Sequence, residues 1–160
     1  NDNNGNIKPS AAEVCNGVDD NCDGAIDPDG SSGCSLRYID SDGDGYGGGA
    51  SVCRCSIAAP YTATNASDCC DSDNRVKPGQ GSYYTSSSNC GTWDYNCNGA
   101  IEKYWNSGGG SCSGTFGCDQ SGGWQGSVAN CGQHKNYING CNWSWFSCDE
   151  KWTGRTQQCR

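Results

Sequence analysis

The chain has 160 residues and a formal net charge of −8, with 25 Gly, 15 Cys, two Phe and no Met. This length suits one medium domain or two small ones, but so few aliphatic side chains cannot form the usual core. No apolar run of about 18 residues is present, so we expect no membrane span, and an acidic chain without a basic stripe argues against nucleic acid as a partner.

The 15 cysteines are the expected source of stability. At this density they indicate a disulfide framework and an oxidising compartment, each bridge contributing roughly 2–4 kcal/mol. Structural zinc is the alternative, but zinc sites need Cys and His at short regular spacing. The chain has only His134 and irregular gaps, although Cys53–Cys55 and Cys69–Cys70 are close pairs. No signal peptide is visible, which favours a mature, already processed or truncated, secreted chain.

The chain begins with an acidic segment that contains an internal repeat. "NDNNGNIKPS…CNGVDDNCDGAID" (1–27) matches "CDSDNRVKPG…CGTWDYNCNGAIE" (70–102), and a Ser/Tyr-rich insertion at 81–88 absorbs the difference in length. Between the two copies, "YIDSDGDGYGGG" (38–49) is present once. The aligned pairs are Asp2 and Asp71, Ile7 and Val76, Lys8 and Lys77, Pro9 and Pro78, Cys15 and Cys90, and Cys22 and Cys97.

Three stretches, at 19–24, 40–45 and 94–99, share the pattern D-x-[DN]-x-[DN]-G. Alternate oxygen ligands before a Gly that permits a sharp turn are what a hard cation such as Ca²⁺ requires. The Glu at position 12 and the flanking helices of an EF-hand are not recognisable. The alternative is Asx-Gly turns, whose side chains bond their own backbone. Three copies within an acidic segment favour a cation, and Mg²⁺ suits an all-protein cage less well than Ca²⁺.

We expect several Ca²⁺ ions, bound at about 10⁻⁴–10⁻³ M as in extracellular modules. The oxygens would come from the loops, from an acid at the ninth position of the first and third loops, and from the segments near residues 2 and 68. The candidate metal ligands are Asp2, Asn4, Asp19, Asn21, Asp23, Asp27, Asp40, Asp42, Asp44, Tyr46, Asp68, Asp71, Asp73, Asp94, Asn96, Asn98 and Glu102.

"EVCNGVDDNCDGAID", "YIDSDGDGYGG" and "SDCCDSDNRVKPG" resemble the tandem "putative metal-binding motif" repeat of secreted and surface proteins of bacteria. That repeat is similar in style to thrombospondin type 3 calcium repeats. The resemblance covers about residues 1–102 and implies a chain wrapped around several Ca²⁺ ions, with little regular secondary structure and no catalysis. Asn98 stands where the family has Asp, and "CGTWDYN" lacks the preceding acid, so the third loop is expected to be the weakest. Cys70 also replaces a family Asp.

Charge and Trp content change near the Gly/Ser stretch at 106–111. Residues 1–102 hold 15 acids and 5 bases, a net charge of −10, whereas residues 103–160 hold 3 acids and 5 bases, a net of +2. The expected domains are therefore acidic calcium-binding repeats with an incomplete first repeat (1–102) and a Cys/Trp-rich module (103–160). The expected fold is small, disulfide-rich and mostly irregular, with short β-hairpins and little helix; the second module is all-β.

The second module has an even number of cysteines, six, and alternates bulky and polar residues in short runs between glycines. This pattern predicts short antiparallel strands stapled by disulfides. Its Trp and Tyr rings could stack on sugars or form a protein interface, but a chain poor in Leu and Phe favours their use as core. Asn65 and Asn142 begin Asn-x-Ser sequons, the acceptor sites for glycans.

Nothing in the chain indicates catalysis: His134 has no acid or nucleophile motif nearby, and we expect neither catalytic residues nor a cofactor other than Ca²⁺. Two functions remain. One is a calcium-rigidified extracellular module of a bacterial cell-surface stalk, fibre or long adhesin. The other is a carbohydrate-binding or adhesive module for which the repeats serve as a spacer.

The first residue aligns with Cys70, so the position before it corresponds to Cys69. Residues 1–102 hold nine cysteines, an odd number that one more would make even. We expect either a piece of a longer tandem array, or a polymer in which a neighbouring subunit supplies the partner thiol and further oxygens.

Overall fold

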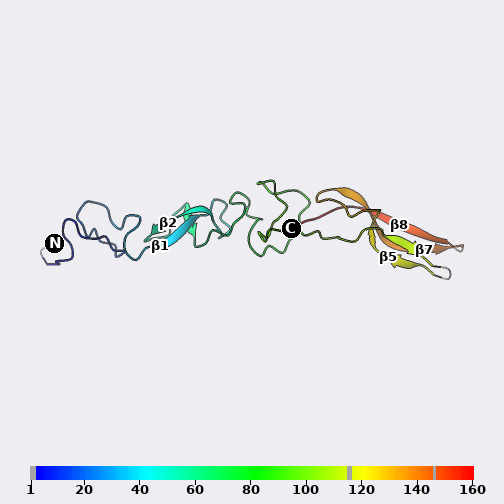
Figure 1. The fold of residues 1–160 in the computed structure, drawn as a ribbon, viewed down its shortest axis with the longest axis horizontal. Coiled ribbons are helices and arrows are strands. Elements are labelled where there is room, and N and C mark those ends of the chain that lie inside the picture. Colours follow the sequence, from blue (N-terminus) through cyan, green and yellow to red (C-terminus); the bar gives the residue numbers. More distant parts are fainter. Residues whose placement is uncertain (1–2, 115–116, 146) are drawn as a thin grey trace. The chain divides into compact units, whose positions relative to one another are not determined.

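The structure is a computed structural model of residues 1–160, and it describes all of them except 1–2, 115–116 and 146. The described residues form no helix and eight short strands, with irregular chain between them (Figure 1). No helix in the described part is therefore long or apolar enough to cross a membrane. Fourteen of the 15 cysteines are disulfide-bonded, which makes seven bridges, and Cys22 keeps a free, exposed thiol. The expected disulfide-rich, mostly irregular fold is confirmed.

The chain divides into a first unit, Asn1–Pro78, and a second unit, Gly79–Arg160. In the first unit, β1 (Ser35–Ile39) lies between β2 (Gly48–Arg54) and β3 (Tyr61–Ala63) in an antiparallel sheet. The bridge Cys15–Cys55 ties the irregular N-terminal segment to the end of β2, and Cys34–Cys53 links the residue before β1 to β2. Because the buried apolar side chains here are small, the bridges carry much of the stabilisation.

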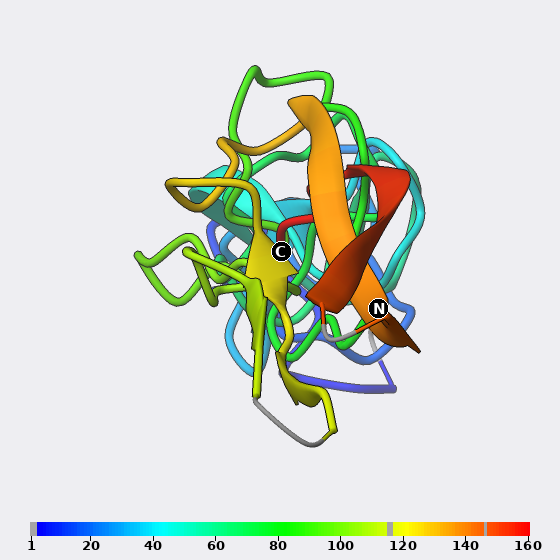
Figure 2. The same cartoon turned by 90° about the vertical axis from the view of Figure 1, so that its right-hand side faces the viewer.

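In the second unit, β4 (Ser111–Ser113) pairs with β5 (Asp119–Ser121). A three-stranded sheet follows, in the order β6 (Gly123–Trp124), β7 (His134–Ser144) and β8 (Ser147–Thr156). Strands β7 and β8 form a long, twisted antiparallel hairpin, orange and red in Figure 2. The six cysteines of residues 103–160 pair among themselves, as Cys112–Cys141, Cys118–Cys148 and Cys131–Cys159, so the prediction of a disulfide-stapled β module is confirmed.

Aromatic rings form the core of the second unit. Trp124 is fully buried, with ring-centre distances of 5.4 Å to Tyr137 and 6.0 Å to Trp105. The use of Trp as core is therefore realised at this position. At the hairpin tip, by contrast, Trp143 is 41 % exposed and Trp145 is 94 % exposed.

The division after Pro78 does not coincide with the change of composition near residue 103. Residues 79–102 of the second repeat copy belong to the same unit as the C-terminal module, because the chain end pairs with them. Glu102 and Arg160 exchange two backbone hydrogen bonds of 3.0 Å, and Tyr84 and Cys159 exchange two more, of 2.8 and 2.9 Å.

Candidate metal centres

The three D-x-[DN]-x-[DN]-G loops have the same backbone turn. In each, the carboxylate of the first Asp accepts hydrogen bonds from the N–H groups of the fifth residue and of the following Gly. The side chain of the third residue accepts from the fifth N–H, and that of the fifth accepts from the seventh. The N–H donors are Asp23, Gly24 and Ala25 in the first loop, Asp44, Gly45 and Tyr46 in the second, and Asn98, Gly99 and Ala100 in the third.

The glycine at the sixth position has a positive φ in all three loops, of 96°, 92° and 82° in chain order. This is the left-handed region, which other residues rarely adopt, so the Gly of the motif is needed for the turn. The Asx-turn alternative is thus realised in every loop. These turns use only one side-chain atom of the third and fifth residues. What the second atom does therefore distinguishes one loop from another.

In the second loop, the remaining oxygens of the third and fifth residues are buried and have no hydrogen-bond partner. These are Oδ2 of Asp42 and Oδ2 of Asp44. The side chain of Asp44 is only 1 % exposed, and each carboxylate of Asp40, Asp42 and Asp44 offers an oxygen within 4.8 Å of the others. Buried carboxylate oxygens without a hydrogen-bond partner are costly, so these oxygens are the candidate cation ligands of the second loop.

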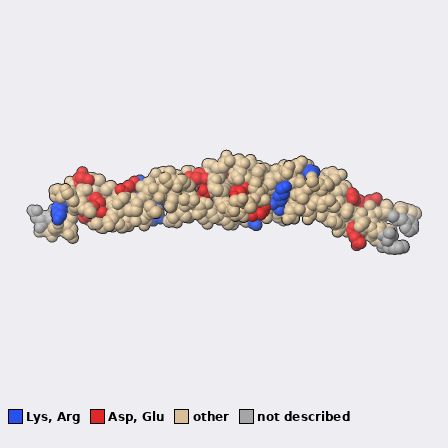
Figure 3. All heavy atoms as spheres, viewed as in Figure 1, with Lys and Arg blue, Asp and Glu red and all other residues tan. Residues whose placement is uncertain are grey.

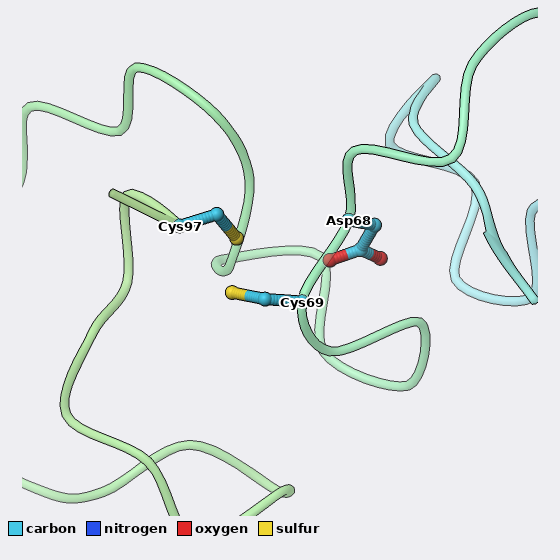
Figure 4. A group of neighbouring side chains, drawn as sticks. All are labelled: Asp68, Cys69 and Cys97. Atoms are coloured by element: carbon cyan, nitrogen blue, oxygen red, sulfur yellow. The ribbon is translucent and has the colours of Figure 1, made fainter. Parts of the chain in front are cut away.

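Asp68 has another buried oxygen without a hydrogen-bond partner, Oδ2, while its Oδ1 accepts a hydrogen bond of 2.8 Å from the Cys70 N–H. Asp68 lies outside the group of mutually close carboxylates formed by Asp40, Asp42 and Asp44. Figure 4 shows the Asp68 carboxylate beside Cys69. Gly47 brings this segment close to the second loop: its carbonyl accepts from the Asp68 N–H at 3.1 Å, and its N–H donates to the Asn65 carbonyl. A Cβ on Gly47 would lie 2.5 Å from the carbonyl oxygen of Ile39, so the close packing of residue 47 against β1 requires glycine.

The electrostatics of the second loop agree with its geometry. Burial raises the pKa of Asp42 above its usual value and the negative charge of Asp44 raises it further, while hydrogen bonds from the backbone of Asp44 and Asp73 oppose this rise. Burial also raises the pKa of Asp68, with the charges of Asp44, Asp42 and Asp71 adding to it and the Cys70 N–H opposing it. Like charges that are poorly solvated raise each other's pKa in this way when no cation balances them.

Asp71 and Asp73 reach the same region but bond to protein groups. Asp71 accepts hydrogen bonds of 2.8 Å from both the N–H and the hydroxyl of Ser41, inside the second loop. Asp73, whose side chain is 3 % exposed, forms a two-pronged ion pair with Arg75 at 2.7 and 2.6 Å. Asp71 therefore braces the loop, and Asp73 is neutralised by arginine. Tyr46, another predicted ligand, donates its backbone N–H to the Asp44 carboxylate.

The first loop has an amide at its third position. Asn21 Nδ2 donates to Asp23 Oδ2 at 3.0 Å. The equivalent oxygen of the second loop, Asp44 Oδ2, has no hydrogen-bond partner. Asp27, at the ninth position, uses both oxygens for the N–H groups of Asn16 and Gly17, at 3.2 and 2.8 Å. Asn4 is exposed and forms its own Asx turn with Asn6. Asp2 lies outside the described residues.

Two acids near the first loop were not among the candidates. Glu13 Oε1 accepts from the Asn21 N–H at 2.8 Å, while Glu13 Oε2 is buried without a hydrogen-bond partner. Asp20 is 6 % exposed and accepts from the Val14 N–H and the Asn16 amide. Glu13 aligns with Ser88 in the second copy of the repeat. This difference between the two copies was the sequence signal that could have identified Glu13 as a candidate.

In the third loop, amide groups occupy the carboxylate of Glu102. Asn98 Nδ2 donates to Glu102 Oε1 at 2.6 Å, and Asn96 Nδ2 donates to Glu102 Oε2 at 3.2 Å. An amide N–H₂ cannot coordinate a cation through nitrogen, so these two side chains would have to rotate to offer oxygen. That the third loop is the weakest metal site stays a prediction.

Sulfur and imidazole ligands are scarce. Cys69 and Cys97, both drawn in Figure 4, are disulfide-bonded, so neither sulfur is a thiolate. The exposed His134 on β7 contacts the Thr156 hydroxyl at 3.2 Å. On the face drawn in Figure 3 the acidic atoms form small separate patches rather than one continuous surface. The candidate metal ligands are therefore the carboxylates inside the loops.

The fold is disulfide-rich, and its candidate metal ligands lie in oxygen-lined loops. Residues 1–28, 68–81 and 88–103 match the model of the Cu-binding_MopE family, whose description is "Putative metal-binding motif". These segments carry that motif, and the resemblance inferred from the sequence is confirmed; the second loop, at 40–45, lies between matched segments. Searches of curated proteins and of solved structures gave no match.

Proposed function

We propose that this protein is a non-catalytic extracellular calcium-binding structural protein, a segment or subunit of a bacterial cell-surface stalk, fibre or long adhesin. The observation that carries the proposal is the set of three buried, unpartnered carboxylate oxygens of Asp42, Asp44 and Asp68. A bound cation would replace the mutual repulsion of these carboxylates with attraction to the ion. The irregular chain on either side would then be held in one conformation.

The choice of Ca²⁺ rests on ligand chemistry. The oxygens of this centre are hard ligands, whereas Cu²⁺ and Zn²⁺ favour imidazole or thiolate. The chain has a single His and no Met, and fourteen of its cysteines are disulfide-bonded. The family name includes copper, so copper is the competing metal for the experiment. Seven disulfides favour an oxidising, extracellular location.

The proposal is tested by equilibrium dialysis of the metal-free protein against Ca²⁺, Mg²⁺, Cu²⁺ and Zn²⁺, with elemental analysis of bound metal. We expect Ca²⁺ to bind and to raise the melting temperature, and EDTA to reverse both effects. The matched variants are Asp42→Asn, in the second loop, and Asp29→Asn, an exposed acid paired with Arg54. Binding of Cu²⁺ alone, or Ca²⁺ binding that is insensitive to Asp42→Asn, would contradict the proposal.

Self-association is the proposed mode of assembly. Cys22 has a free, exposed thiol, whereas its repeat counterpart Cys97 is disulfide-bonded. This asymmetry supports a disulfide between Cys22 and a cysteine of another chain or of a longer tandem array. Non-reducing electrophoresis and peptide mass spectrometry of the native protein should reveal the linked peptide, and Cys22→Ser should abolish it. Recovery of Cys22 only as a free thiol would argue against this assembly.

The exposed rings of Trp143 and Trp145 favour a second function, carbohydrate binding at the hairpin tip. Exposed aromatic rings stack on apolar sugar faces. A glycan array probed with the whole chain, and with Trp145→Ala beside the buried-core variant Trp124→Phe, tests it. Binding that is lost only on Trp145→Ala would favour adhesion, with the calcium loops as a spacer.

A further inference from the structure

We propose that Lys77 is a built-in counter-ion of the second-loop metal centre and sets its affinity for the metal. Its Nζ lies 4.0 Å from Oδ2 of Asp44, the oxygen that is buried without a hydrogen-bond partner. The inference rests on the proposed calcium function. It adds that a resident positive charge competes with the ion for the same carboxylates.

The distance between the two atoms is consistent with this role. At 4.0 Å the ammonium group attracts the carboxylate through space but does not form a hydrogen bond with it. The coordinating position of Asp44 Oδ2 therefore stays available. The Lys77 side chain is 35 % exposed, so its charged end can turn toward water when a metal ion enters, as long lysine side chains do.

Lys77 is the positively charged side chain of this segment that lies near the second loop, because the neighbouring arginine is paired elsewhere. Arg75 is committed to Asp73 through two short contacts of 2.7 and 2.6 Å. Val76 is fully buried, and its N–H donates to the Asp73 carbonyl at 2.8 Å, which anchors the backbone before Lys77. The flexible part of the residue is therefore its side chain, while its attachment point is fixed.

The charge balance explains why such a residue is useful. Asp40, Asp42, Asp44, Asp68 and Asp71 bring five formal negative charges to or beside the centre, and the charges of Asp42, Asp44, Asp68 and Asp71 act on one another. Lys77 offsets one of these charges in the metal-free protein. A divalent ion near Lys77 is repelled by it, so removing the lysine charge should tighten Ca²⁺ binding by roughly three- to tenfold.

The experiment compares Lys77→Met with Lys8→Met in the full chain. Lys8 aligns with Lys77 in the first copy of the repeat and is exposed, and no ion pair involves it within the described residues. We expect Lys77→Met to lower the Kd for Ca²⁺ three- to tenfold, and to lower the melting temperature of the metal-free protein. Lys8→Met should leave both unchanged, and Lys77→Arg should bind Ca²⁺ as the natural protein does.

The outcomes separate the two proposals. If the natural protein binds Ca²⁺ but Lys77→Met binds it equally or more weakly, the counter-ion role is overturned and the calcium function stands. If the natural protein binds no Ca²⁺, both proposals fail. Where Lys77→Met does not fold, Lys77→Gln removes the same charge and keeps a polar end, and a Kd equal to that of the natural protein would again overturn the inference.

Discussion

Asp71 binds Ser41 across a separation of 30 residues, accepting hydrogen bonds of 2.8 Å from both its N–H and its hydroxyl. Ser41 lies between the first two carboxylates of the second loop, so Asp71 holds the loop from outside. A second contact between the same two segments runs through Gly47 and Asp68. The second loop is thus held in place by a second part of the chain through these two sets of contacts.

Removing this brace should weaken both the fold and metal binding. Asp71→Ala leaves the Ser41 groups without their acceptor, at a cost of about 1–2 kcal/mol in the free energy of unfolding, and Ca²⁺ affinity should fall because the loop must be ordered on binding. Denaturant unfolding and Ca²⁺ titration measure the two effects. Ser41→Ala, which loses only the hydroxyl bond, is the graded control and should show about half the loss. Unchanged Ca²⁺ affinity in Asp71→Ala would show that the brace does not serve the centre.

Neutralising a ligand should have opposite effects with and without metal. Asp68→Asn removes one of the three unpartnered charged oxygens, so it relieves repulsion in the metal-free protein and raises its melting temperature. The same change should weaken Ca²⁺ binding at least tenfold and reduce the stabilisation by Ca²⁺. Differential scanning calorimetry in EDTA and in excess Ca²⁺ gives both numbers. An equal shift of the melting temperature in EDTA and in excess Ca²⁺ would mean that Asp68 acts only on the fold.

The stability of the metal-free protein should depend on pH through Asp42 and Asp68. Their pKa values in the folded state are raised above the ordinary value of 3.8, chiefly by burial. In the window above 3.8 the folded state therefore binds more protons than the unfolded state, so this contribution to stability is present at low pH and is lost as pH rises through the raised pKa.

Melting temperatures of metal-free protein between pH 3 and pH 7 test this effect. Other carboxylates titrate in the same range, so the quantity to compare is the difference between the natural protein and the double variant Asp42→Asn/Asp68→Asn. That difference should favour the variant increasingly as pH rises. With Ca²⁺ bound, the sign reverses, since protons compete with the metal. A difference that is independent of pH would contradict the pKa directions.

Restoring an acid should improve the third loop. Asn98→Asp replaces the amide that donates to Glu102 Oε1 at 2.6 Å with a carboxylate, which would repel Glu102 in the metal-free state and provide a ligand in the loaded state. We expect lower stability in EDTA and a higher Ca²⁺ stoichiometry or affinity. Asn130→Asp, which adds the same charge outside the loop, is the control and should leave Ca²⁺ binding unchanged. Equal Ca²⁺ binding by the two variants would count against a latent site at this loop.

Local features of the fold were predictable from the residues alone. The D-x-[DN]-x-[DN]-G spacing predicted three loops with the same turn, because Asx hydrogen bonds and a left-handed Gly are decided within six residues. Asn98 was also the reason to expect the third loop to be the weakest, and this stays a prediction. Even cysteine numbers after residue 103 predicted bridges within that segment, whereas odd numbers before it predicted an unpaired thiol without identifying Cys22.

Long-range features were not predictable in this way. Asp71 and Asp73 carry the same charge and lie two residues apart, yet one braces Ser41 and the other pairs with Arg75. Nothing in the motif separates them. Glu13 was missed for the same reason, since its contact with Asn21 spans eight residues outside the loop pattern.

The sequence by itself determined the turns, the disulfide-rich character and the kind of atom each loop can offer, because these depend on neighbouring residues and on composition. Only the tertiary structure decided which oxygens are left for a metal. An oxygen is available when no N–H or hydroxyl of a distant segment reaches it, and burial then makes its charge costly. Oδ2 of Asp42, Asp44 and Asp68 meets that condition, whereas Asp71 accepts the hydrogen bonds of Ser41.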